Sequence, residues 1–590
     1  MTSIPRGRSL PFALSSLLVA LLAGCATPQA SGPAPAPAGA PIEIGIVAIN
    51  DFHGALEPPK QSVNVIQPDG SVLAVPAGGG AWLASAVDAI KAEHRYNVVV
   101  AAGDLTSASQ LSSSLYLDEP AVGVMNRIGL EFNAVGNHEF DRGWKELQRL
   151  QNGGCEKNAI AKPCQLEPFP GASYKYLAAA TFKADGSTLF PATGLKTFDT
   201  PSGKVTVGFV GLSLKGVTTL VRPDAIAGLT FGDEADAINR AVPQLRAAGA
   251  DAVVVLIHQG GKTTTPDPNG CEGFYGDIKP ILDRLQPGVD VVVSGHTHWS
   301  YVCSDQPSGA GPLLLTSAGV YGELVTDITL TIDPARHRVI AKKAHNVIVQ
   351  SEPYTASRGS IARTDRFPQF SPRADVATFV KRYKDASLTL VNRPIGKVSR
   401  GAAKLDGSES NQGGTLGNLI ADSQLAGSRR AGAQIAFTNP FGIRTSLAPA
   451  PDGTVTFGQL YAITPFSNEL VTMTLTGAQV RAIIEEGLDD DGPQQVLSPS
   501  RGLMFSYDMR RPAGSRIVSL TLDGKPLGAA TPYRVTVVNF LADGGDGYGG
   551  FTKGTDRTRG MLDIDAFEQW IAAVPIREVP QENRAVRVGK

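Results

Sequence analysis

The sequence has few cysteines, few histidines and no excess of positive charge. Of its 590 residues five are cysteine and eight are histidine, and 54 basic residues are balanced by 55 acidic ones, for a net charge of -1. Proteins that bind nucleic acid polymers usually carry a basic excess, so the composition argues against that class. Hydrophobic residues make up 42% and charged residues 18% of the chain, which is typical of a folded globular protein.

Long apolar runs are also missing beyond the first residues. Leu10 to Ala23 is apolar, follows Arg6 and Arg8, and is too short to span a bilayer comfortably, so it predicts a signal peptide. It ends in Leu22-Ala23-Gly24-Cys25, which resembles the bacterial lipobox, whose cysteine is lipidated. Residues 26–41 are rich in Ala, Pro and Gly and predict a flexible tether. The alternative is a plain secretory signal; we favour a lipid anchor at Cys25 in the bacterial cell envelope, periplasmic or at the cell surface.

The other four cysteines are consistent with export. They are Cys155, Cys164, Cys271 and Cys303, and an even number outside the cytosol suggests two disulfides. Of the three possible pairings, Cys155 with Cys164 closes a short loop, and Cys271 with Cys303 then closes a longer one. A structural zinc site is the weaker alternative because the chain has no CxxC pair.

The length predicts more than one domain, because single cores stop growing at roughly 250–300 residues. Residues 42–350 alternate short apolar runs with helical patterns and predict a layered α/β domain. The expected strands are Ile42–Ile49, Val98–Ala102, Val205–Val210, Ala252–Ile257 and Val289–Val293, and the expected helices are Trp82–His94 and Asp233–Ala248.

A linker and a second domain follow. Residues 351–393 predict an irregular segment and then a helix over Pro372–Leu388, with Ser371 as its N-cap. Residues 394–590 again mix both patterns and predict an α/β domain. Its expected helices are Thr415–Ala426 and Thr476–Glu486, and its expected strands are Leu470–Leu475 and Tyr533–Val538.

Five polar motifs follow apolar runs of the first domain. They are Asn50-Asp51-Phe52-His53-Gly54, Gly103-Asp104, Gly136-Asn137-His138-Glu139-Phe140-Asp141, Ile257-His258 and Gly295-His296-Thr297-His298. Ligands of α/β folds bind at the carboxyl ends of the strands, where these motifs are expected. Each motif alone could be a polar turn or a core histidine. Together, the five motifs contain five of the eight histidines, and this concentration favours a single shared site.

The residue types in these motifs suit divalent metals. Imidazole and carboxylate ligands bind zinc, manganese or iron, and an aspartate can bridge two ions. Two ions about 3.5–4 Å apart can hold a phosphoryl group and lower the pKa of a bound water. The pattern therefore predicts a two-metal phosphoesterase.

With these motifs the sequence resembles the 5′-nucleotidase and UDP-sugar hydrolase family of calcineurin-like metallophosphoesterases, from about Ile42 to Arg587. The resemblance implies an N-terminal α/β/β/α metallophosphoesterase domain and a C-terminal α/β substrate-binding domain. It implies that Asp51, His53, Asp104 and His298 bind one metal, and that Asp104, Asn137, His258 and His296 bind the other. It also implies that His138 is the catalytic histidine, oriented by Asp141.

The resemblance extends to the second domain. Asn439 and Arg444 match a phosphate-binding segment, and arginine can hold phosphate with two hydrogen bonds. Phe466 and Phe540 match the two aromatic walls around a base, and Asp546 matches a carboxylate that binds ribose hydroxyls. Each could instead be a core aromatic, a surface arginine or a turn. The family's further arginines are missing from 409–414, so the expected phosphate clamp is thinner.

The sequence thus predicts an exported hydrolase of nucleotides that releases nucleoside and phosphate, with a small-molecule nucleotide as partner and no nucleic acid polymer. The alternatives within the enzyme class are 2′,3′-cyclic nucleotides, UDP-sugars or a sulfur ester. The alternative outside it is a lipid-tethered nucleotide-binding module with a decayed site. The complete set of seven metal ligands argues against decay.

Overall fold

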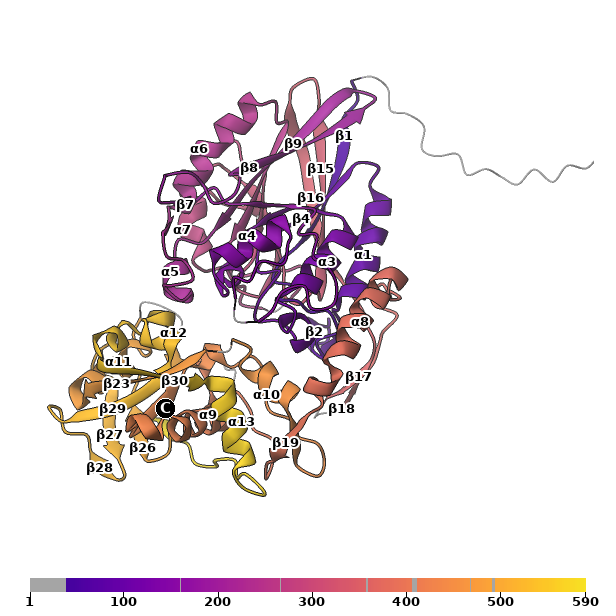
Figure 1. The fold of residues 1–590 in the computed structure, drawn as a ribbon. Coiled ribbons are helices and arrows are strands. Elements are labelled where there is room, and N and C mark those ends of the chain that lie inside the picture. The colour runs from indigo at the N-terminus through magenta and orange to yellow at the C-terminus, as the bar shows by residue number, and fades with distance from the viewer. Residues whose placement is uncertain are drawn as a thin grey trace, which may run out of the picture.

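The computed structural model describes residues 39–159, 161–265, 267–356, 359–405, 411–466, 468–490 and 494–589. The expected signal peptide, Cys25 and most of the tether lie outside these ranges. Within them, no helix combines the length and the apolar character that a bilayer crossing requires. The described chain forms two α/β units connected by the helix α8 (Ala374–Val391), which runs along one side of the molecule (Figure 1).

The N-terminal unit contains two six-stranded sheets. The first has the order β16 (Arg338–Ile348), β15 (Leu324–Asp333), β1 (Ile42–Ile49), β4 (Asn97–Ala101), β5 (Leu130–Ala134) and β6 (Lys175–Leu177). The second has the order β13 (Ser300–Gln306), β14 (Leu313–Ala318), β12 (Val291–Ser294), β11 (Ala252–His258), β9 (Gly203–Ser213) and β8 (Thr193–Thr200).

The two sheets pack face to face, with helices on both outer faces. One core cluster lies between the sheets and takes alternate residues of β1 and β11, such as Ile44, Ile46, Val254 and Leu256. A second cluster joins the first sheet to α1 (Gly80–Glu93), α3 (Glu119–Ile128), α4 (Trp144–Asn152) and α8. A third joins the second sheet to α6 (Glu234–Ala247) and α7 (Ile278–Asp283). The expected α/β/β/α layering is confirmed.

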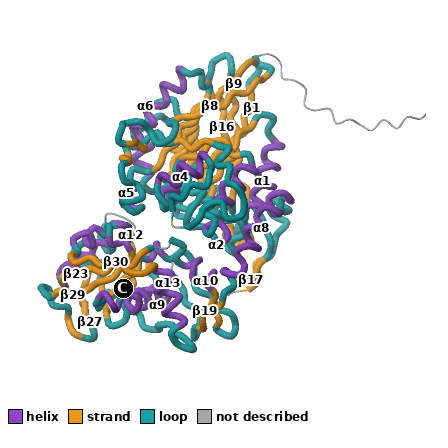
Figure 2. Tube along the Cα trace, in the orientation of Figure 1, coloured by secondary structure: helices purple, strands orange, loops and turns teal. Residues whose placement is uncertain are grey.

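The C-terminal unit packs helices against smaller sheets (Figure 2). A five-stranded sheet has the order β25 (Ser498–Pro499), β21 (Ile435–Thr438), β29 (Pro532–Val538), β23 (Glu469–Thr476) and β30 (Thr555–Leu562). A four-stranded sheet has the order β28 (Lys525–Pro526), β27 (Ile517–Leu522), β26 (Leu503–Tyr507) and β31 (Ala585–Arg587). The main helices are α9 (Gly414–Gly427), α10 (Phe457–Ile463), α11 (Gly477–Glu486), α12 (Asn539–Ala542) and α13 (Asp563–Ala572).

The linker departs from the sequence expectation in two places. Its first part is not wholly irregular, since β17 (Tyr354–Ala356) pairs with β18 (Gly359–Ile361). The helix begins at Ala374, so the expected cap at Ser371 is wrong. The backbone N–H of Arg373 donates to Ala81 O (3.0 Å), and this bond to α1 holds Arg373 in an extended conformation outside the helix.

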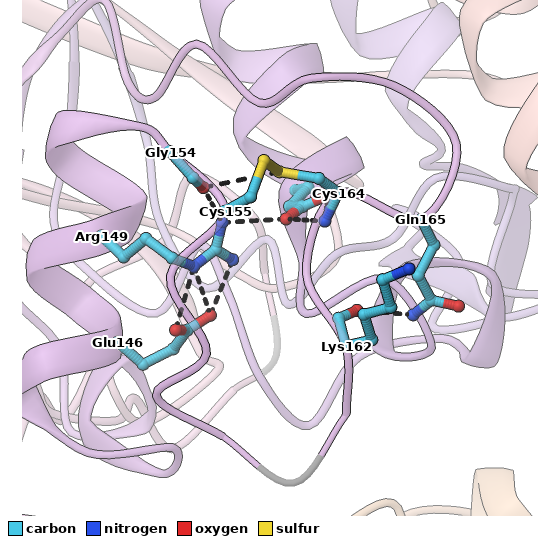
Figure 3. Close-up of a disulfide and its surroundings, with 8 residues drawn as sticks. Glu146, Arg149, Gly154, Cys155, Lys162, Cys164 and Gln165 are labelled. Atoms are coloured by element: carbon cyan, nitrogen blue, oxygen red, sulfur yellow. Dashed lines mark hydrogen bonds and ion pairs between the residues drawn. A yellow bond between two sulfur atoms is a disulfide. The ribbon is translucent and has the colours of Figure 1, made fainter.

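The four cysteines of the described chain form two disulfides. Cys155 joins Cys164, and Cys271 joins Cys303. The first closes a loop over a buried ion pair, in which Arg149 Nη1 donates to Glu119 Oε1 (2.9 Å). Figure 3 shows the disulfide beside Arg149 and Glu146. The Cys164 N–H also donates to Glu119 Oε1 (2.9 Å), so the loop helps to neutralise that buried carboxylate.

Candidate metal and substrate site

The polar motifs of the first unit meet at one edge of the two sheets. Parallel neighbours β1, β4 and β5 end just before Asp51, Asp104 and Asn137. Parallel neighbours β11 and β12 end at His258 and just before His296. The carboxyl ends of parallel strands share an edge of the sheet. Because the sheets are stacked, these side chains converge between them.

Three glycines let the backbones approach one another at this edge. A Cβ atom at Gly136 would lie 2.1 Å from Asp104 Oδ1, and one at Gly103 would lie 2.7 Å from His258 Nδ1. A Cβ atom at Gly295 would lie 2.9 Å from Asp51 Oδ2. Any larger residue would displace the ligand groups, so these glycines are part of the site.

Asp51, His53 and His298 form the first group of donor atoms. His53 Nδ1–H donates to Ser107 O (2.9 Å), which leaves the Nε2 lone pair free to face His298 Nε2, 3.2 Å away. Asp51 Oδ1 lies 3.8 Å from His53 Nε2 and 3.5 Å from His298 Nε2. Two imidazole nitrogens and a carboxylate oxygen therefore surround one point, as ligands of a metal ion do.

Asp104, His258 and His296 form the second group. His258 Nδ1–H donates to Ala102 O (2.8 Å), and its Nε2 lies 2.9 Å from Asp104 Oδ2 and 3.1 Å from Asn137 Oδ1. Asp104 Oδ2 also lies 3.8 Å from His53 Nε2 of the first group. This carboxylate is therefore placed where it can bridge two ions.

The backbone is strained at most of these donors. Residues other than glycine rarely adopt left-handed φ angles. Such angles occur here at Asp51 (49°), His53 (46°), Asp104 (51°), His296 (71°) and His298 (57°). Such conformations cost about 1–3 kcal/mol each and gather at functional sites. The strain supports a role in binding rather than in packing.

Burial keeps two of the ligand histidines neutral, whereas the buried carboxylates hold a proton on a third, His258. Burial lowers the pKa of His53 to about 3 and that of His296 to about 3, so both rings have a free lone pair. Burial raises the pKa of Asp51 to about 7. Burial opposes protonation of His258, but Asp104 and Asp51 raise its pKa to about 10. Buried carboxylates attracting protons in this way are well matched to divalent cations.

His138 and Asp141 lie beside the donor groups. His138 Nδ1–H donates to Asp141 Oδ2 (2.8 Å), so Nε2 is directed elsewhere. Burial opposes protonation of His138, but Asp141 and Asp104 raise its pKa above the ordinary value. Glu139, which the sequence analysis left without a role, accepts backbone N–H groups from Gly136 and Asp104 (both 2.8 Å) and thereby fixes the loops that carry the ligands.

The C-terminal unit brings four of the five predicted substrate residues toward this centre. The Phe466 ring stacks on His138, with centroids 5.9 Å apart and planes at 16°. Arg444 Nη2 is buried and has no hydrogen-bond partner among the described residues. Burial and the charge of Arg444 lower the pKa of His298, and the same charge partly offsets the rise that burial causes in the pKa of Asp546, so Arg444 lies near both.

Asp546 and Asn439 form a pair on the same side. Asn439 Nδ2 donates to Asp546 Oδ2 (2.5 Å), and burial raises the pKa of Asp546 to about 6. Phe540 is placed differently: its ring lies against Gly545, where a Cβ atom would be 2.5 Å from it. No ring contact between Phe540 and Phe466 occurs in the described structure.

Tyr321 is a neighbour of the site that the sequence analysis missed. Its ring contacts His53 and His298, with centroid distances of 5.9 and 6.2 Å. Its φ angle of 57° is left-handed, and its N–H donates to Asp51 O (2.8 Å). Tyr321 belongs to none of the polar motifs. Its strained backbone marks it in the structure, but a sequence does not reveal backbone angles.

The fold and the donor groups define the class of hydrolases with a dinuclear metal centre at the edge of a layered α/β/β/α domain. Family comparison agrees and is more specific. Residues 44–300 match the calcineurin-like phosphoesterase family, and residues 394–553 match the 5′-nucleotidase C-terminal domain. The chain belongs to the 5′-nucleotidase family of calcineurin-like phosphoesterases, which are metal-dependent phosphoric ester hydrolases with a dinuclear centre.

Individual relatives cover most of this chain. Endonuclease YhcR of Bacillus subtilis is 28% identical over 85% of the chain, but the chain spans only 37% of that protein's length. A probable 5′-nucleotidase of Treponema pallidum is 25% identical, over 86% of this chain and 87% of the relative. The crystal structure of a 5′-nucleotidase precursor from Thermus thermophilus has a similar fold, with a TM-score of 0.71, 24% identity and coverage of 93% and 100% of the two chains.

Proposed function

We propose that the protein is an exported two-metal phosphoesterase that hydrolyses nucleotides to nucleoside and phosphate. The proposal rests on one observation: the side chains predicted to bind the nucleoside and the phosphate lie close to the two groups of metal-ligand candidates. Phe466 stacks on His138, and the unpartnered Nη2 of Arg444 lies near the histidines of both groups. Aromatic faces bind bases and arginine binds phosphate, so one molecule can satisfy both.

The proposed metal ligands are Asp51, His53, Asp104 and His298 for one ion and Asp104, Asn137, His258 and His296 for the other. Their oxygen and imidazole donors suit zinc, manganese or iron. Two such ions polarise a phosphoryl group and lower the pKa of a bound water.

The chain's own residues supply the remaining steps. Although burial opposes protonation of His138, Asp141 and Asp104 raise its pKa, and Asp141 accepts the Nδ1–H (2.8 Å). The protonated ring carries its second proton at Nε2, and it can pass this proton to the leaving oxygen. Arg444 adds positive charge where negative charge develops on the phosphoryl oxygens. Asn439 and Asp546 offer an amide and a carboxylate to the ribose hydroxyls. Phe540 would complete the base site only after its ring turns away from Gly545.

Export and lipid anchoring at Cys25 belong to the same proposal. The support is the sequence of residues 1–41 together with the two disulfides, which persist in oxidising compartments. We propose the division into a metallophosphoesterase domain at 42–350, a linker at 351–393 and a substrate domain at 394–590 on the same basis.

A substrate panel tests the proposal. We would compare kcat/KM for AMP, UDP-glucose, 2′,3′-cyclic AMP and an aryl phosphate, in wild type and in Phe466→Ala. The nucleotidase proposal is supported if kcat/KM is highest for AMP in wild type and falls in Phe466→Ala toward the value for aryl phosphate. Preference for UDP-glucose or the cyclic nucleotide would replace the substrate and keep the metal centre. Equal loss on all four substrates in Phe466→Ala would contradict the assigned base wall.

A further inference from the structure

A buried polar cluster joins the two units next to the proposed site. Asp118 is fully buried and accepts hydrogen bonds from Arg142 Nη1, from Ser107 N–H (2.9 Å) and from Ser113 Oγ (2.7 Å). Burial would raise the pKa of Asp118, but Arg142 and these hydrogen bonds hold it below the ordinary value. The pair is therefore charged, and it is expensive to break because either partner would be left buried alone.

Arg142 also begins a directional chain of hydrogen bonds into the C-terminal unit. Its Nη2 donates to Ser114 Oγ (2.9 Å), and Ser114 Oγ is hydrogen-bonded to Tyr461 Oη on α10. Tyr461 Oη in turn donates to Pro465 O (3.0 Å). Each hydroxyl accepts from the side of Arg142 and donates toward Pro465, so the guanidinium charge polarises the whole chain.

This cluster is connected to three parts of the proposed site, by one hydrogen bond and by two neighbours in the sequence. Ser107 O accepts the Nδ1–H of His53, a metal-ligand candidate (2.9 Å). Arg142 directly follows Asp141, the partner of His138. Pro465 directly precedes Phe466, whose ring stacks on His138. A shift of Tyr461 would therefore displace the aromatic wall relative to the catalytic histidine.

The backbone around the cluster is strained at four residues. Ser107 (φ 64°), Ala108 (48°), Leu117 (55°) and Asp118 (61°) all adopt left-handed angles. Strain of this kind persists where surrounding contacts enforce it and marks functional segments. Between these residues, Leu111 is buried in the core cluster of the C-terminal unit, so the strained segment is also the docking segment.

We propose that Arg142 and Asp118 are positioning residues that, through Ser114 and Tyr461, hold the C-terminal unit in the orientation in which Phe466 and Arg444 face the metal ligands. The cluster then favours nucleotides over small phosphate esters, because only a nucleotide uses both units fully. This selectivity rests on the proposed function, whereas the hold on domain orientation does not.

The kinetic test uses Tyr461→Phe, which removes one hydroxyl, in the full-length protein. Tyr533→Phe is the matched control, since its hydroxyl accepts from Gly528 N–H elsewhere in the same unit (3.0 Å). We expect the ratio of kcat/KM on AMP to that on aryl phosphate to fall about fivefold to twentyfold in Tyr461→Phe and to stay unchanged in the control. Adding Ser114→Ala should change little further, because both variants break one chain. An unchanged ratio, or additive effects, would overturn the proposal.

A structural test separates this proposal from the proposed function. In a Cys25→Ser background, spin labels at Ala92→Cys on α1 and Ala478→Cys on α11, both exposed helix positions, report the distance between the units. We expect a narrow distribution of label distances in wild type. The distribution should broaden or gain a second peak in Tyr461→Phe and in Arg142→Gln. In Arg142→Lys it should be narrower than in Arg142→Gln. Identical distributions would overturn the proposal even for an active enzyme. Broadening in a protein inactive on every nucleotide would support it while refuting the proposed substrate.

Discussion

At the scale of single residues, the free donor of Arg444 is the feature most directly tied to substrate. Its Nη2 is buried without a partner in the described part of the chain, which is costly unless a ligand supplies an acceptor. We expect Arg444→Ala to lower kcat/KM on AMP by about 10²–10³-fold, as removal of one preorganised donor does. Arg444→Lys should recover only part, because lysine keeps the charge but not the planar pair of donors. Steady-state kinetics on both variants checks this, and wild-type rates in Arg444→Ala would refute the role.

Glu323 provides a residue-scale test of stability. It is 8% exposed, its Oε1 has no partner in the described structure, and burial raises its pKa from 4.5 to about 8. A folded-state pKa above the unfolded value means that the folded protein binds the proton more tightly. Its contribution to stability is therefore full below about pH 4.5 and is lost as pH rises toward about 8. We expect Glu323→Gln, compared with wild type, to gain several degrees in Tm between about pH 5 and about pH 8.

Thermal unfolding of wild type and Glu323→Gln over that pH range measures the effect. The difference in Tm between the two proteins must grow with pH. A difference that stays constant would show that Glu323 is ionised in the folded protein throughout and would refute the assignment.

At the scale of elements, the turns after the strands set the metal geometry. A Cβ atom at Gly136 would lie 2.1 Å from Asp104 Oδ1 and 2.5 Å from the Asp104 backbone nitrogen, so the loop after β5 must move away from β4. We expect Gly136→Ala to bind less than one metal ion per chain while remaining folded. Elemental analysis of the purified protein measures this. Gly549→Ala is the control, because nothing lies within 4 Å of its Cβ position. Full metal content in Gly136→Ala would contradict the proposed bridging role of Asp104.

The elements also explain what could be predicted from the sequence. Each motif follows a strand, and the carboxyl ends of parallel strands lie at the same edge of a sheet. The positions of the motifs were therefore enough to predict that Asp51, Asp104 and His258 lie close together. The start of α8 could not be found in this way, because Arg373 is held outside the helix by Ala81, which is remote in the sequence. Left-handed angles at Tyr321 and Asp118 were also hidden, since both residue types usually adopt other conformations.

At the scale of the whole molecule, the site is assembled from both units. The α/β/β/α layering and the family were predictable, because they depend on local periodicity and on short motifs. The contact between Ser114 and Tyr461 spans 347 residues and joins a serine and a tyrosine that belong to no motif. Contacts of this kind depend on how two finished units dock, which no local pattern encodes. The proposed positioning role of Arg142 therefore emerged only from the structure.

The proposed function of the whole molecule depends most on two metal ions acting together on a nucleotide. The most direct measurement is phosphate release from AMP by the chelator-stripped protein as manganese or zinc is added back in known equivalents. We predict no turnover without metal and a rate that rises until two ions are bound per chain, because the donor atoms form two groups and Asp104 Oδ2 of the second lies 3.8 Å from His53 Nε2 of the first. Turnover that survives complete metal removal, or that reaches its maximum at one ion per chain, would contradict it.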